Sequence, residues 1–576
     1  MRSGDDPVPL NPSPADDLAA SSETSADRTP GPVAPEYDPT VPGLLQYVMQ
    51  QFGDRDCVVT PDDRLTYRDL ERRSRHLAER LISVGVGKGT RVGVLFPNGT
   101  AWVVAWCAAA RLGAIVIPVN TFYRPAELLR FLVHADVHVV IGVDGFLHHD
   151  YLERLESIAP ELAVHAGAPL RLGALPQLRH VLLWGPAKRD WAKGDYGRGL
   201  DESSGSTGHL VAGMEAAVTP SDPMLVTYTS GSTGEPKGVV HGHGPLLRHA
   251  RNLAALSGAD ASSRIWTPMP LCWVGGFAFT LLRAMSVGGC FVTQEVFDAG
   301  VALELMSRER VTIVSAWPAA SKALREHPDF ERTDLSALRA GSFYEGLPPD
   351  RRPPDQGLII GSLGMSETGG PHTFWTAADE TCGAPEAYRG TFGRPVPGTQ
   401  HRIIDPDTGT DVEAGTEGEV LVRGYSLMLG LYKKERAEVF DVDGWYHTGD
   451  RGLFRDGWFF FTGRQSDLIK TAGSNVAPIE VEAALLAQPE VKLAFVVGVP
   501  DPDRGENVVA LVVPWAVQAS AELGDELRAR LREQLSSYKV PSRVELISDG
   551  DVPWLVSQKA DRRALGALAA SRTART

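Results

Sequence analysis

The sequence predicts an α/β protein with a large N-terminal domain of parallel sheets wrapped by helices plus a small β-barrel-like part, followed by a smaller α+β C-terminal domain. Two observations support this prediction. Short, wholly apolar runs alternate with amphipathic segments in the first half of the chain, and such strands are typical of parallel sheets covered by helices. From about residue 392 the strands are instead separated by acidic, glycine-rich connections, which indicates antiparallel sheet.

The parallel part is best defined between residues 65 and 143. Leu70, Leu77 and Leu81 fall at helical spacing, and three glycines after them end the helix. Strands and helices then alternate, as strand 92–96, helix 101–112, strand 114–119, helix 125–134 and strand 137–143. The same apolar strand pattern recurs at residues 312–317 and 357–362.

A smaller α+β unit follows Gly463. A helix begins at Pro478, and after it we expect strands at 493–499 and 507–514, a helix at 521–537 and a strand at 542–548. The tail before the first domain is rich in proline and acidic residues and has no aromatic residue, so it cannot offset the entropy of ordering. We therefore predict three segments, namely a disordered tail at 1–36, an N-terminal domain at 37–463 and a C-terminal domain at 464–576.

Composition excludes several functional classes. The formal net charge of −15 argues against nucleic acid as a partner. The five cysteines are widely spaced and form no CxxC pair, so neither a disulfide framework nor a thiolate zinc site is expected. The apolar stretch 101–119 is interrupted by Arg111 and Gly113, which indicates a buried helix and strand instead of a membrane span. The N-terminus has no secretory signal pattern, so cytoplasmic is the default localisation.

The segment LVTYTSGSTGEPKG (residues 225–238) carries the strongest local signal. An apolar strand leads into small and hydroxyl residues whose N–H and O–H groups can surround an anion, and Lys237 adds a cation, so we expect a polyphosphate loop. The spacing is not that of a Walker loop. The alternative, a Ser/Gly linker, better fits the similar SSGSTG at 203–208, which no apolar strand precedes. The predicted phosphate contacts are Thr229, Ser230, Gly231, Ser232, Thr233 and Gly234.

Four further segments follow in order: GSLGMSETGG (361–370), GWYHTGD (444–450), TGRQSDLIKTAGSNVAPIEVEAAL (462–485) and VPWLVSQKADRRAL (552–565). Together with the loop, they resemble the AMP-binding, adenylate-forming enzymes, a family that includes acyl-CoA synthetases, adenylation domains of peptide synthetases and beetle luciferases. The resemblance covers roughly residues 40–570. It implies ATP, Mg²⁺ and CoA as cofactors and a mobile C-terminal domain that rotates between two half-reactions.

The resemblance also implies roles for individual residues. Glu367 would coordinate Mg²⁺ on the ATP phosphates, and Lys237 would hold the β- and γ-phosphates. Lys559 would be the catalytic lysine that bridges the substrate carboxylate and the α-phosphate. Asp450 and Arg464 would bind the ribose. Further cofactor contacts fall on Ser342, Leu363, Gly364, Ser366, Lys470 and Gly473, of which the last two lie near the pantetheine channel.

Three positions depart from the family pattern. Leu363 stands where an aromatic residue usually stacks on adenine, which predicts weaker ATP binding. Ser466 stands where the hinge residue is often acidic or basic. Gln558 replaces the glycine that usually precedes the catalytic lysine.

The resemblance places the acyl pocket at MPLCWVGGFAFTLL (269–282), with Trp273 at its gate and Gly275 and Gly276 beside it. No Asp or Glu occurs between residues 265 and 294, so an amino acid's ammonium group would be buried without a partner and an apolar or aromatic acid is expected. Core packing alone is the alternative interpretation of this apolar run. The segment 343–345, Phe-Tyr-Glu, either narrows the pocket or places a carboxylate in it. HGHG at 241–244 is more typical of a structural or substrate-adjacent loop than of a metal site.

We therefore predict an AMP-forming acid–thiol ligase. ATP would activate a carboxylic acid, a fatty or other apolar or aromatic one, to an acyl-adenylate, and CoA would accept the acyl group, giving acyl-CoA, AMP and pyrophosphate. Two alternatives stay open: an acyl-AMP ligase or stand-alone adenylation enzyme that loads a separate carrier protein, and a non-catalytic nucleotide-binding protein. The non-catalytic alternative is disfavoured by the joint presence of five charged residues with implied roles: Lys237, Glu367, Asp450, Arg464 and Lys559. The sequence carries no signal for the oligomeric state or for the chain length of the acid.

Overall fold

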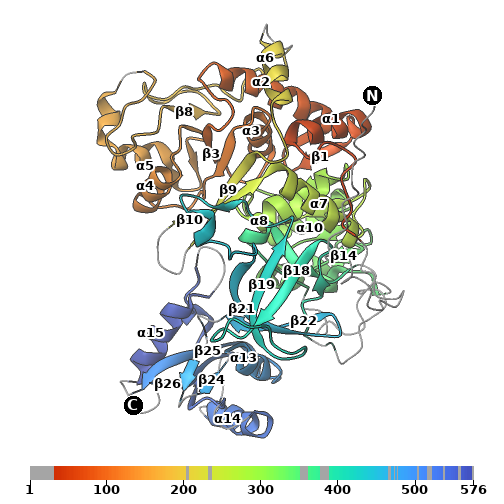
Figure 1. Ribbon diagram of the computed structural model, residues 1–576, viewed down its shortest axis with the longest axis vertical. Coiled ribbons are helices and arrows are strands. Elements are labelled where there is room, and N and C mark those ends of the chain that lie inside the picture. Colours follow the sequence, from red (N-terminus) through yellow and green to blue (C-terminus); the bar gives the residue numbers. More distant parts are fainter. Residues whose placement is uncertain are drawn as a thin grey trace, which may run out of the picture.

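The structure of the protein is a computed structural model. It describes residues 31–165, 167–202, 207–230, 236–349, 361–376, 388, 390–464, 467, 469–471, 474–476, 478–501, 505–515, 520, 522–535, 539–555 and 560–573. Figure 1 shows the N-terminal sheets at one end of the long axis and the C-terminal unit, in blue, at the other. The large and small α/β parts confirm the predicted fold class.

A seven-stranded sheet lies in the part of the chain nearest the N-terminus. In sheet order its strands are β20 (Gly430–Leu431), β10 (Pro236–Gly242), β9 (Pro223–Ser230), β4 (Ile115–Pro118), β3 (Arg91–Leu95), β5 (Val139–Gly142) and β8 (His180–Leu183). The strands from β9 to β8 pair in parallel, as their apolar sequences predict, whereas β10 and β20 are antiparallel additions at the β9 edge. The helices between these strands are α2 (Tyr67–Ile82), α3 (Thr100–Ala110), α4 (Pro125–His134), α5 (Tyr151–Ile158) and α6 (Gly208–Ala216).

A six-stranded sheet combines four strands from residues 264–341 with two strands from the red, N-terminal part of Figure 1. Its order is β14 (Ala340–Gly341), β13 (Ile313–Val314), β11 (Arg264–Trp266), β12 (Cys290–Val292), β1 (Asp56–Val59) and β2 (Arg64–Thr66), and every pair is parallel except β1–β2. The helices of this region are α1 (Val41–Phe52), α7 (His243–Leu256), α8 (Val274–Gly276), the π-helix η2 (Phe277–Leu282), α9 (Arg283–Met285), α10 (Ala299–Arg308) and α11 (Pro318–Glu326).

The predicted antiparallel part consists of two small sheets. One contains β15 (Ser362–Met365), β16 (Gly370–Phe374) and β17 (Arg394–Pro395), and the other contains β18 (Thr399–Ile404), β19 (Gly418–Gly424), β21 (Tyr446–Arg455) and β22 (Trp458–Arg464). The described part of the predicted strand 357–362 begins only at Gly361, because residues 357–360 lie outside the described residues.

The C-terminal unit has one five-stranded sheet, with β24 (Ser474–Val476), β23 (Ile469–Thr471), β26 (Gly505–Pro514), β25 (Val491–Asp501) and β27 (Arg543–Leu546). Its helices are α13 (Pro478–Leu486), α14 (Leu523–Gln534) and α15 (Arg562–Thr573). All the elements predicted after Gly463 are present.

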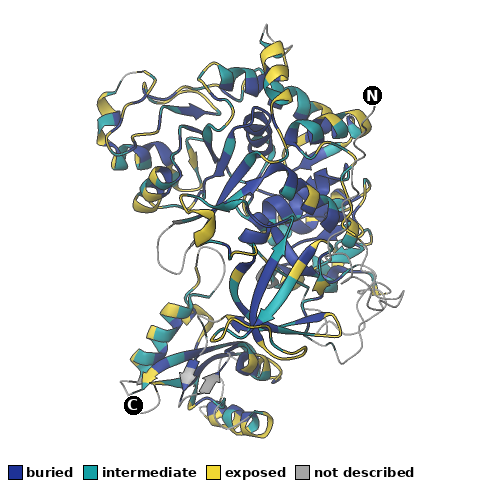
Figure 2. Cartoon of the chain, in the orientation of Figure 1, coloured by how far each residue is buried: buried dark blue, intermediate teal, exposed yellow. Residues whose placement is uncertain are grey.

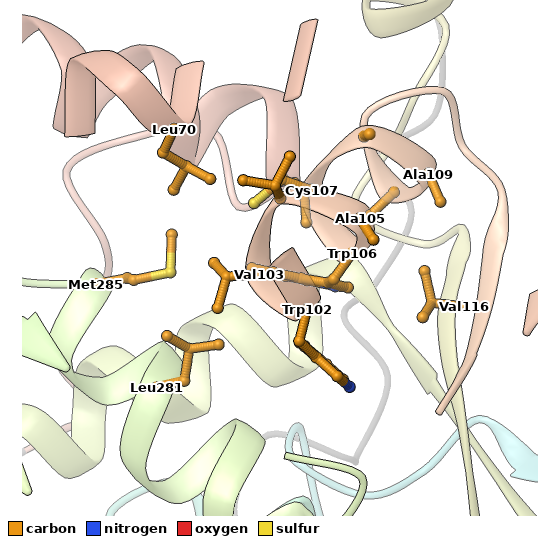
Figure 3. Close-up of a cluster of buried hydrophobic side chains, with 14 of the residues drawn as sticks. Leu70, Trp102, Val103, Ala105, Trp106, Cys107, Ala109, Val116, Leu281 and Met285 are labelled. Carbon is orange, nitrogen blue, oxygen red and sulfur yellow. The ribbon is translucent and has the colours of Figure 1, made fainter. Parts of the chain in front are cut away.

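The core of the N-terminal domain surrounds α3. Nearly all of this helix is buried, and a helix that is apolar on every side has to lie inside a domain. Figure 3 shows α2, β4 and the π-helix supplying Leu70, Val116 and Leu281 around it. The rings of Trp102 and Trp106 lie 5.5 and 4.9 Å from Phe277 of the π-helix, centroid to centroid. The dark-blue interior in Figure 2 follows the same elements, so the expected buried helix is confirmed.

Among the described residues, none of the helices has the length and apolar character needed to cross a membrane. The predicted tail is described only from Gly31 onward. There the backbone N–H of Val33 donates to Asn252 Oδ1 of α7 over 3.3 Å, so the last residues of the predicted tail lie against the folded chain.

Candidate active site

The predicted phosphate loop falls in the sequence between two antiparallel strands, β9 and β10. Lys237 of β10 pairs with Thr229 of β9, and Pro236 pairs with Ser230. The loop residues Gly231, Ser232, Thr233 and Gly234 lie outside the described residues. Lys237 is therefore the second residue of β10, held in register with Thr229 of β9.

Glu367 lies on a short 3₁₀ turn, Ser366–Thr368, between β15 and β16. Gly369 follows in the left-handed region, at φ 69°, where glycine is favoured. Before the turn, a Cβ on Gly364 would lie 2.5 Å from the carbonyl oxygen of Gly370, so the close approach of β15 and β16 requires glycine there. The backbone of Glu367 is also fixed, because Met428 N–H donates to its carbonyl over 2.8 Å.

The side chains of Lys237, Glu367 and Tyr446 meet in a triangle. The ammonium group of Lys237 forms an ion pair with Glu367 Oε1. The hydroxyl of Tyr446, the first residue of β21, lies 3.1 Å from Lys237 Nζ and donates to Glu367 Oε1 over 3.1 Å. Two residues that the sequence assigned to different motifs are therefore brought together, and a third, Tyr446, joins them.

Burial and charge decide the protonation of this triangle. Burial by itself would raise the pKa of Glu367, but the charge and hydrogen bond of Lys237 hold that pKa below its ordinary value. Burial likewise opposes the charge of Lys237, and the Glu367 carboxylate more than offsets it, so the pKa of Lys237 is raised. Burial and the carboxylate raise the pKa of Tyr446 to about 12. At neutral pH the triangle is a cation, an anion and a neutral phenol.

Asp450 and Arg464 form a second charged pair. They are cross-strand partners on β21 and β22, and Arg464 Nε donates to Asp450 Oδ1 over 2.9 Å. The pairing of β19 with β21 is interrupted between His447 and Arg451, where Gly449 has φ 69°, and such bulges re-aim side chains. Asp450 is only 2% exposed, and burial raises its pKa despite the guanidinium. The charge of Glu367 raises it further, so both predicted carboxylates belong to one electrostatic site.

Ser342 lies at the end of β14 and acts on the backbone. Its Oγ accepts from Ala316 N–H over 2.8 Å and donates to the Ala316 carbonyl over 2.8 Å. This reciprocal pair fixes the chain just after β13. The structure thus gives Ser342 a scaffolding contact, and its predicted role toward the nucleotide stays a prediction.

The predicted acyl segment begins with a half-buried Trp273 at the N-terminus of α8. A Cβ on Gly276 would lie 2.4 Å from the Pro270 carbonyl oxygen, and one on Gly275 would lie 2.8 Å from Met269 Sδ. Gly276 is therefore required by the close packing of α8 on the preceding loop, whereas a Cβ at Gly275 would meet only the flexible side chain of Met269. The π-helix comes next, and π-turns are frequent at functional sites.

The structure gives clear contacts to two of residues 343–345. Phe343 is fully buried against Phe330, with centroids 5.7 Å apart, in the hydrophobic cluster beside β13. The Glu345 carboxylate accepts from Arg325 Nη1 over 2.8 Å. Phe343 is thus a core residue, because the chain turns it into the cluster, and the Glu345 carboxylate forms an ion pair with α11.

Several predicted site residues cannot be placed. Lys559, Gln558, Ser466 and Gly473 lie outside the described residues, and only the backbone of Lys470, in β23, is described. Leu363 packs on the cluster of Val239 and Phe459 and is half-buried. In the described part of the chain, no group of three or more His, Cys, Asp or Glu side chains could hold a metal ion.

Sequence reasoning missed Tyr446 and His241. Tyr446 lies inside the GWYHTGD segment, and its position four residues before Asp450 was the available signal. His241 Nε2 lies 2.7 Å from the Ser366 carbonyl oxygen. Its signal was the even spacing from Lys237 along a strand, which puts both side chains on one face.

Comparison with known proteins gives one consistent result. The family model described as AMP-binding enzyme matches residues 45–432, and the model for the AMP-binding enzyme C-terminal domain matches residues 480–554. A feruloyl-CoA synthase of Amycolatopsis sp is 33% identical over 84% of this chain and 89% of its own length. An acyl-CoA ligase, sidI, of Aspergillus fumigatus is 30% identical over 88% of this chain and 86% of its own. The crystal structure of the anthranilate CoA ligase AuaEII in complex with anthranoyl-AMP shares the fold, with a TM-score of 0.75 and 24% identity over 95% of this chain and 99% of that one.

Proposed function

The chain belongs to the AMP-binding enzyme family, and from this membership we propose that it activates an apolar or aromatic carboxylic acid with ATP and transfers the acyl group to CoA. In the first step a carboxylate oxygen bonds to the α-phosphorus of ATP, and the bond from that phosphorus to the pyrophosphate oxygen breaks. In the second step the CoA sulfur bonds to the acyl carbon, AMP leaves, and the thiol proton goes to solvent. The products are acyl-CoA, AMP and pyrophosphate.

The observation that carries the proposal is the triangle of Lys237, Glu367 and Tyr446 beside the phosphate-loop hairpin. The first step brings two anions together, so the site has to screen negative charge. Lys237 supplies a cation at the base of the loop. When ATP enters, its phosphates would take the place of the Glu367 carboxylate on Lys237, which leaves that carboxylate for a divalent cation.

The donors present fit Mg²⁺. Glu367 offers a buried carboxylate of lowered pKa, which is a hard oxygen ligand that stays ionised at neutral pH. Mg²⁺ is commonly held by one or two carboxylates together with substrate phosphates, so no cluster of protein ligands is needed. Bound there, the ion would neutralise charge on the phosphates. Lys237 and Tyr446 would orient the carboxylate for it.

Asp450 and Arg464 would bind the ribose of the nucleotide. The Asp450 carboxylate is anchored by Arg464 Nε through Oδ1 and can accept hydrogen bonds from ribose hydroxyls. Arg464 is also the last residue of β22, directly before the C-terminal unit. We place the boundary between the two domains there, so rotation of residues 464–576 would remove Lys559 from the site before CoA attacks.

The proposed substrate class rests on the acyl segment. No acidic residue occurs between residues 265 and 294, and the π-helix side chain of Phe279 faces Phe374 at 6.1 Å. Such surroundings suit an apolar acyl or aryl group and leave a substrate ammonium group without a partner. Trp273 would stand at the entrance to this segment.

The test is acid-dependent pyrophosphate release with Mg²⁺ and ATP, on the parent and on Glu367→Gln. We expect apolar acids to support release by the parent and the variant to lose about a hundredfold, the range for removing a key electrostatic contact. Addition of CoA should convert the adenylate to a thioester. Pyrophosphate release that needs no acid, or that Glu367→Gln leaves unchanged, would overturn the proposal.

A further inference from the structure

His241 and Lys237 lie on the same strand, β10, and reach the same turn. They are four residues apart in a strand without a register shift between them, so their side chains share one face. Lys237 contacts the carboxylate of Glu367, and His241 Nε2 lies 2.7 Å from the carbonyl oxygen of the preceding residue, Ser366. Strand β10 therefore contacts the Ser366–Glu367 segment twice: Lys237 binds the Glu367 side chain, and His241 binds the Ser366 backbone.

The protonation state of His241 follows from its surroundings. The side chain is fully buried, and burial lowers its pKa to about 4, so the imidazole is neutral at neutral pH. A carbonyl oxygen only accepts, so the proton lies on Nε2 and that nitrogen donates to Ser366. Nδ1 is buried and has no hydrogen-bond partner among the described residues.

An apolar side chain of similar size would fill this position without the cost of a buried, unsatisfied nitrogen. The Nε2 bond is therefore the contribution that distinguishes histidine here. The Ser366 carbonyl also accepts from Gly369 N–H over 3.1 Å, which closes the 3₁₀ turn. With His241 as second donor, both lone pairs are used and the plane of the Ser366–Glu367 peptide is fixed.

We propose that His241 is a positioning residue, whose bond to the Ser366 carbonyl sets the direction in which Glu367 presents its carboxylate to nucleotide-bound Mg²⁺. This inference rests on the function proposed above for Glu367. Residues that orient a metal ligand through hydrogen bonds, without contacting the metal, commonly contribute about 10–100-fold to metal affinity. The effect of losing His241 should therefore appear in the Mg²⁺ requirement as well as in stability.

His243 provides a matched control. It is equally buried, it lies in the same HGHG segment, and burial likewise lowers its pKa to about 4. Its Nδ1 accepts from Val41 N–H of α1 over 3.1 Å, so this hydrogen bond goes to α1 and not to the Glu367 turn. Loss of His243 should thus reproduce the general cost of removing a buried imidazole without altering the position of Glu367.

The experiment compares His241→Met, His241→Gln and His243→Met with the parent protein. Methionine removes the N–H at similar size, whereas the glutamine amide can place an N–H near the position of Nε2. Three quantities are measured: the melting temperature without ligand, its rise on addition of ATP with Mg²⁺, and the Mg²⁺ concentration that half-saturates pyrophosphate release. If His241→Met does not fold, His241→Asn replaces it, because its amide is too short to reach Ser366.

We expect both methionine variants to melt at lower temperature. Only His241→Met should need about tenfold more Mg²⁺ and lose most of the nucleotide-induced rise in melting temperature, and His241→Gln should restore both to within about threefold. An unchanged Mg²⁺ requirement in His241→Met, or a glutamine variant that resembles the methionine one, would overturn the inference. Glu367→Gln is measured beside them: if it too leaves the Mg²⁺ requirement unchanged, it is the proposed function of Glu367 that fails.

Discussion

The ammonium group of Lys237 lies against the carboxylate of Glu367, although the two residues are 130 positions apart in the chain. Each group would be costly to bury alone, and each holds the other in its charged form. The pair thus keeps a cation and an anion ready inside the site. When ATP and a divalent cation bind and the pair separates, the phosphates would neutralise Lys237 and the cation would neutralise Glu367.

This relationship predicts a pH-dependent loss of stability in Lys237→Met. Without the ammonium group of Lys237, burial should raise the pKa of Glu367. The variant should therefore be least stable at the higher pH values, at which Glu367 is charged. We expect a deficit of about 1–3 kcal/mol at pH 8, shrinking toward pH 5 as Glu367 takes up a proton. In the parent the pKa of Glu367 is lowered, so its contribution is complete above the ordinary value of 4.5 and disappears only as pH falls below it. Urea unfolding at both pH values measures the deficit.

The double variant Lys237→Met/Glu367→Gln is the control for that experiment. It has no carboxylate at position 367, so its deficit relative to the parent should be nearly the same at pH 5 and pH 8. A deficit of Lys237→Met that does not change with pH would contradict the ion pair.

Tyr446→Phe should weaken the triangle without breaking it. The hydroxyl contacts both Lys237 Nζ and Glu367 Oε1, and one such hydrogen bond is worth about 0.5–1.5 kcal/mol. We expect adenylation to fall about tenfold. Tyr425→Phe, which removes a hydroxyl bonded to Asn252 instead, should leave the rate of pyrophosphate release unchanged. Equal effects of the two variants would mean that Tyr446 has no special place in the site.

Asp450→Asn should remove the preference for ATP over 2′-deoxy-ATP. The parent should use ATP better than 2′-deoxy-ATP by about tenfold or more, since hydrogen bonds to charged groups are the stronger ones. The variant should have a higher KM for ATP and should treat the two nucleotides nearly alike. Because burial already raises the pKa of Asp450, removal of its charge should not reduce the melting temperature. A variant that keeps the full preference for ATP would exclude Asp450 from ribose binding.

Trp273→Leu should broaden the range of acids toward larger ones and leave KM for ATP unchanged. Trp266→Leu is the matched control, because Trp266 is completely buried on β11. We expect the control to lose stability, by an amount of about 1–3 kcal/mol, with the same relative activity among acids as the parent. If Trp273→Leu also loses stability and keeps the parent's relative activity among acids, Trp273 is a core residue and does not control access to the acyl pocket. Free α-amino acids should be poor substrates of the parent, and efficient use of one would refute the proposed substrate class.

Lys559→Ala should lower adenylation by about a hundredfold while ATP binding stays near normal, as expected for a group that acts on developing charge. Formation of the thioester from a supplied acyl-adenylate should be affected much less, since the proposed rotation takes Lys559 out of the site. Pyrophosphate release at the parental rate would show that the lysine of this motif is not the catalytic one.

The sequence predicted the parallel sheets and the buried helix α3 because their signal is local. Apolar runs and helical spacing depend only on neighbours in the chain. The site was predicted only as separate motifs. Whether Lys237 meets Glu367 depends on the register of β9 with β10 and on the turn after β15, which are tertiary features.

Residues outside the motif pattern show what was missed. His241 was grouped with His243 as part of HGHG, yet the strand turns one toward Ser366 and the helix start turns the other toward α1. Phe343 was considered for the acyl pocket, but the turn after β14 directs it into the core. Periodicity alone does not distinguish a pocket wall from a core when both are apolar.

The central claim is that the acid attacks the α-phosphorus of ATP, and transfer of ¹⁸O tests it most directly. An accepted apolar acid labelled with ¹⁸O in both carboxylate oxygens is incubated with the protein, Mg²⁺, ATP and CoA, and the products are analysed by mass spectrometry. We predict a single ¹⁸O in AMP, none in pyrophosphate, and acyl-CoA that retains the other. Formation of ADP, label in pyrophosphate or phosphate, or AMP without label would contradict activation through an acyl-adenylate.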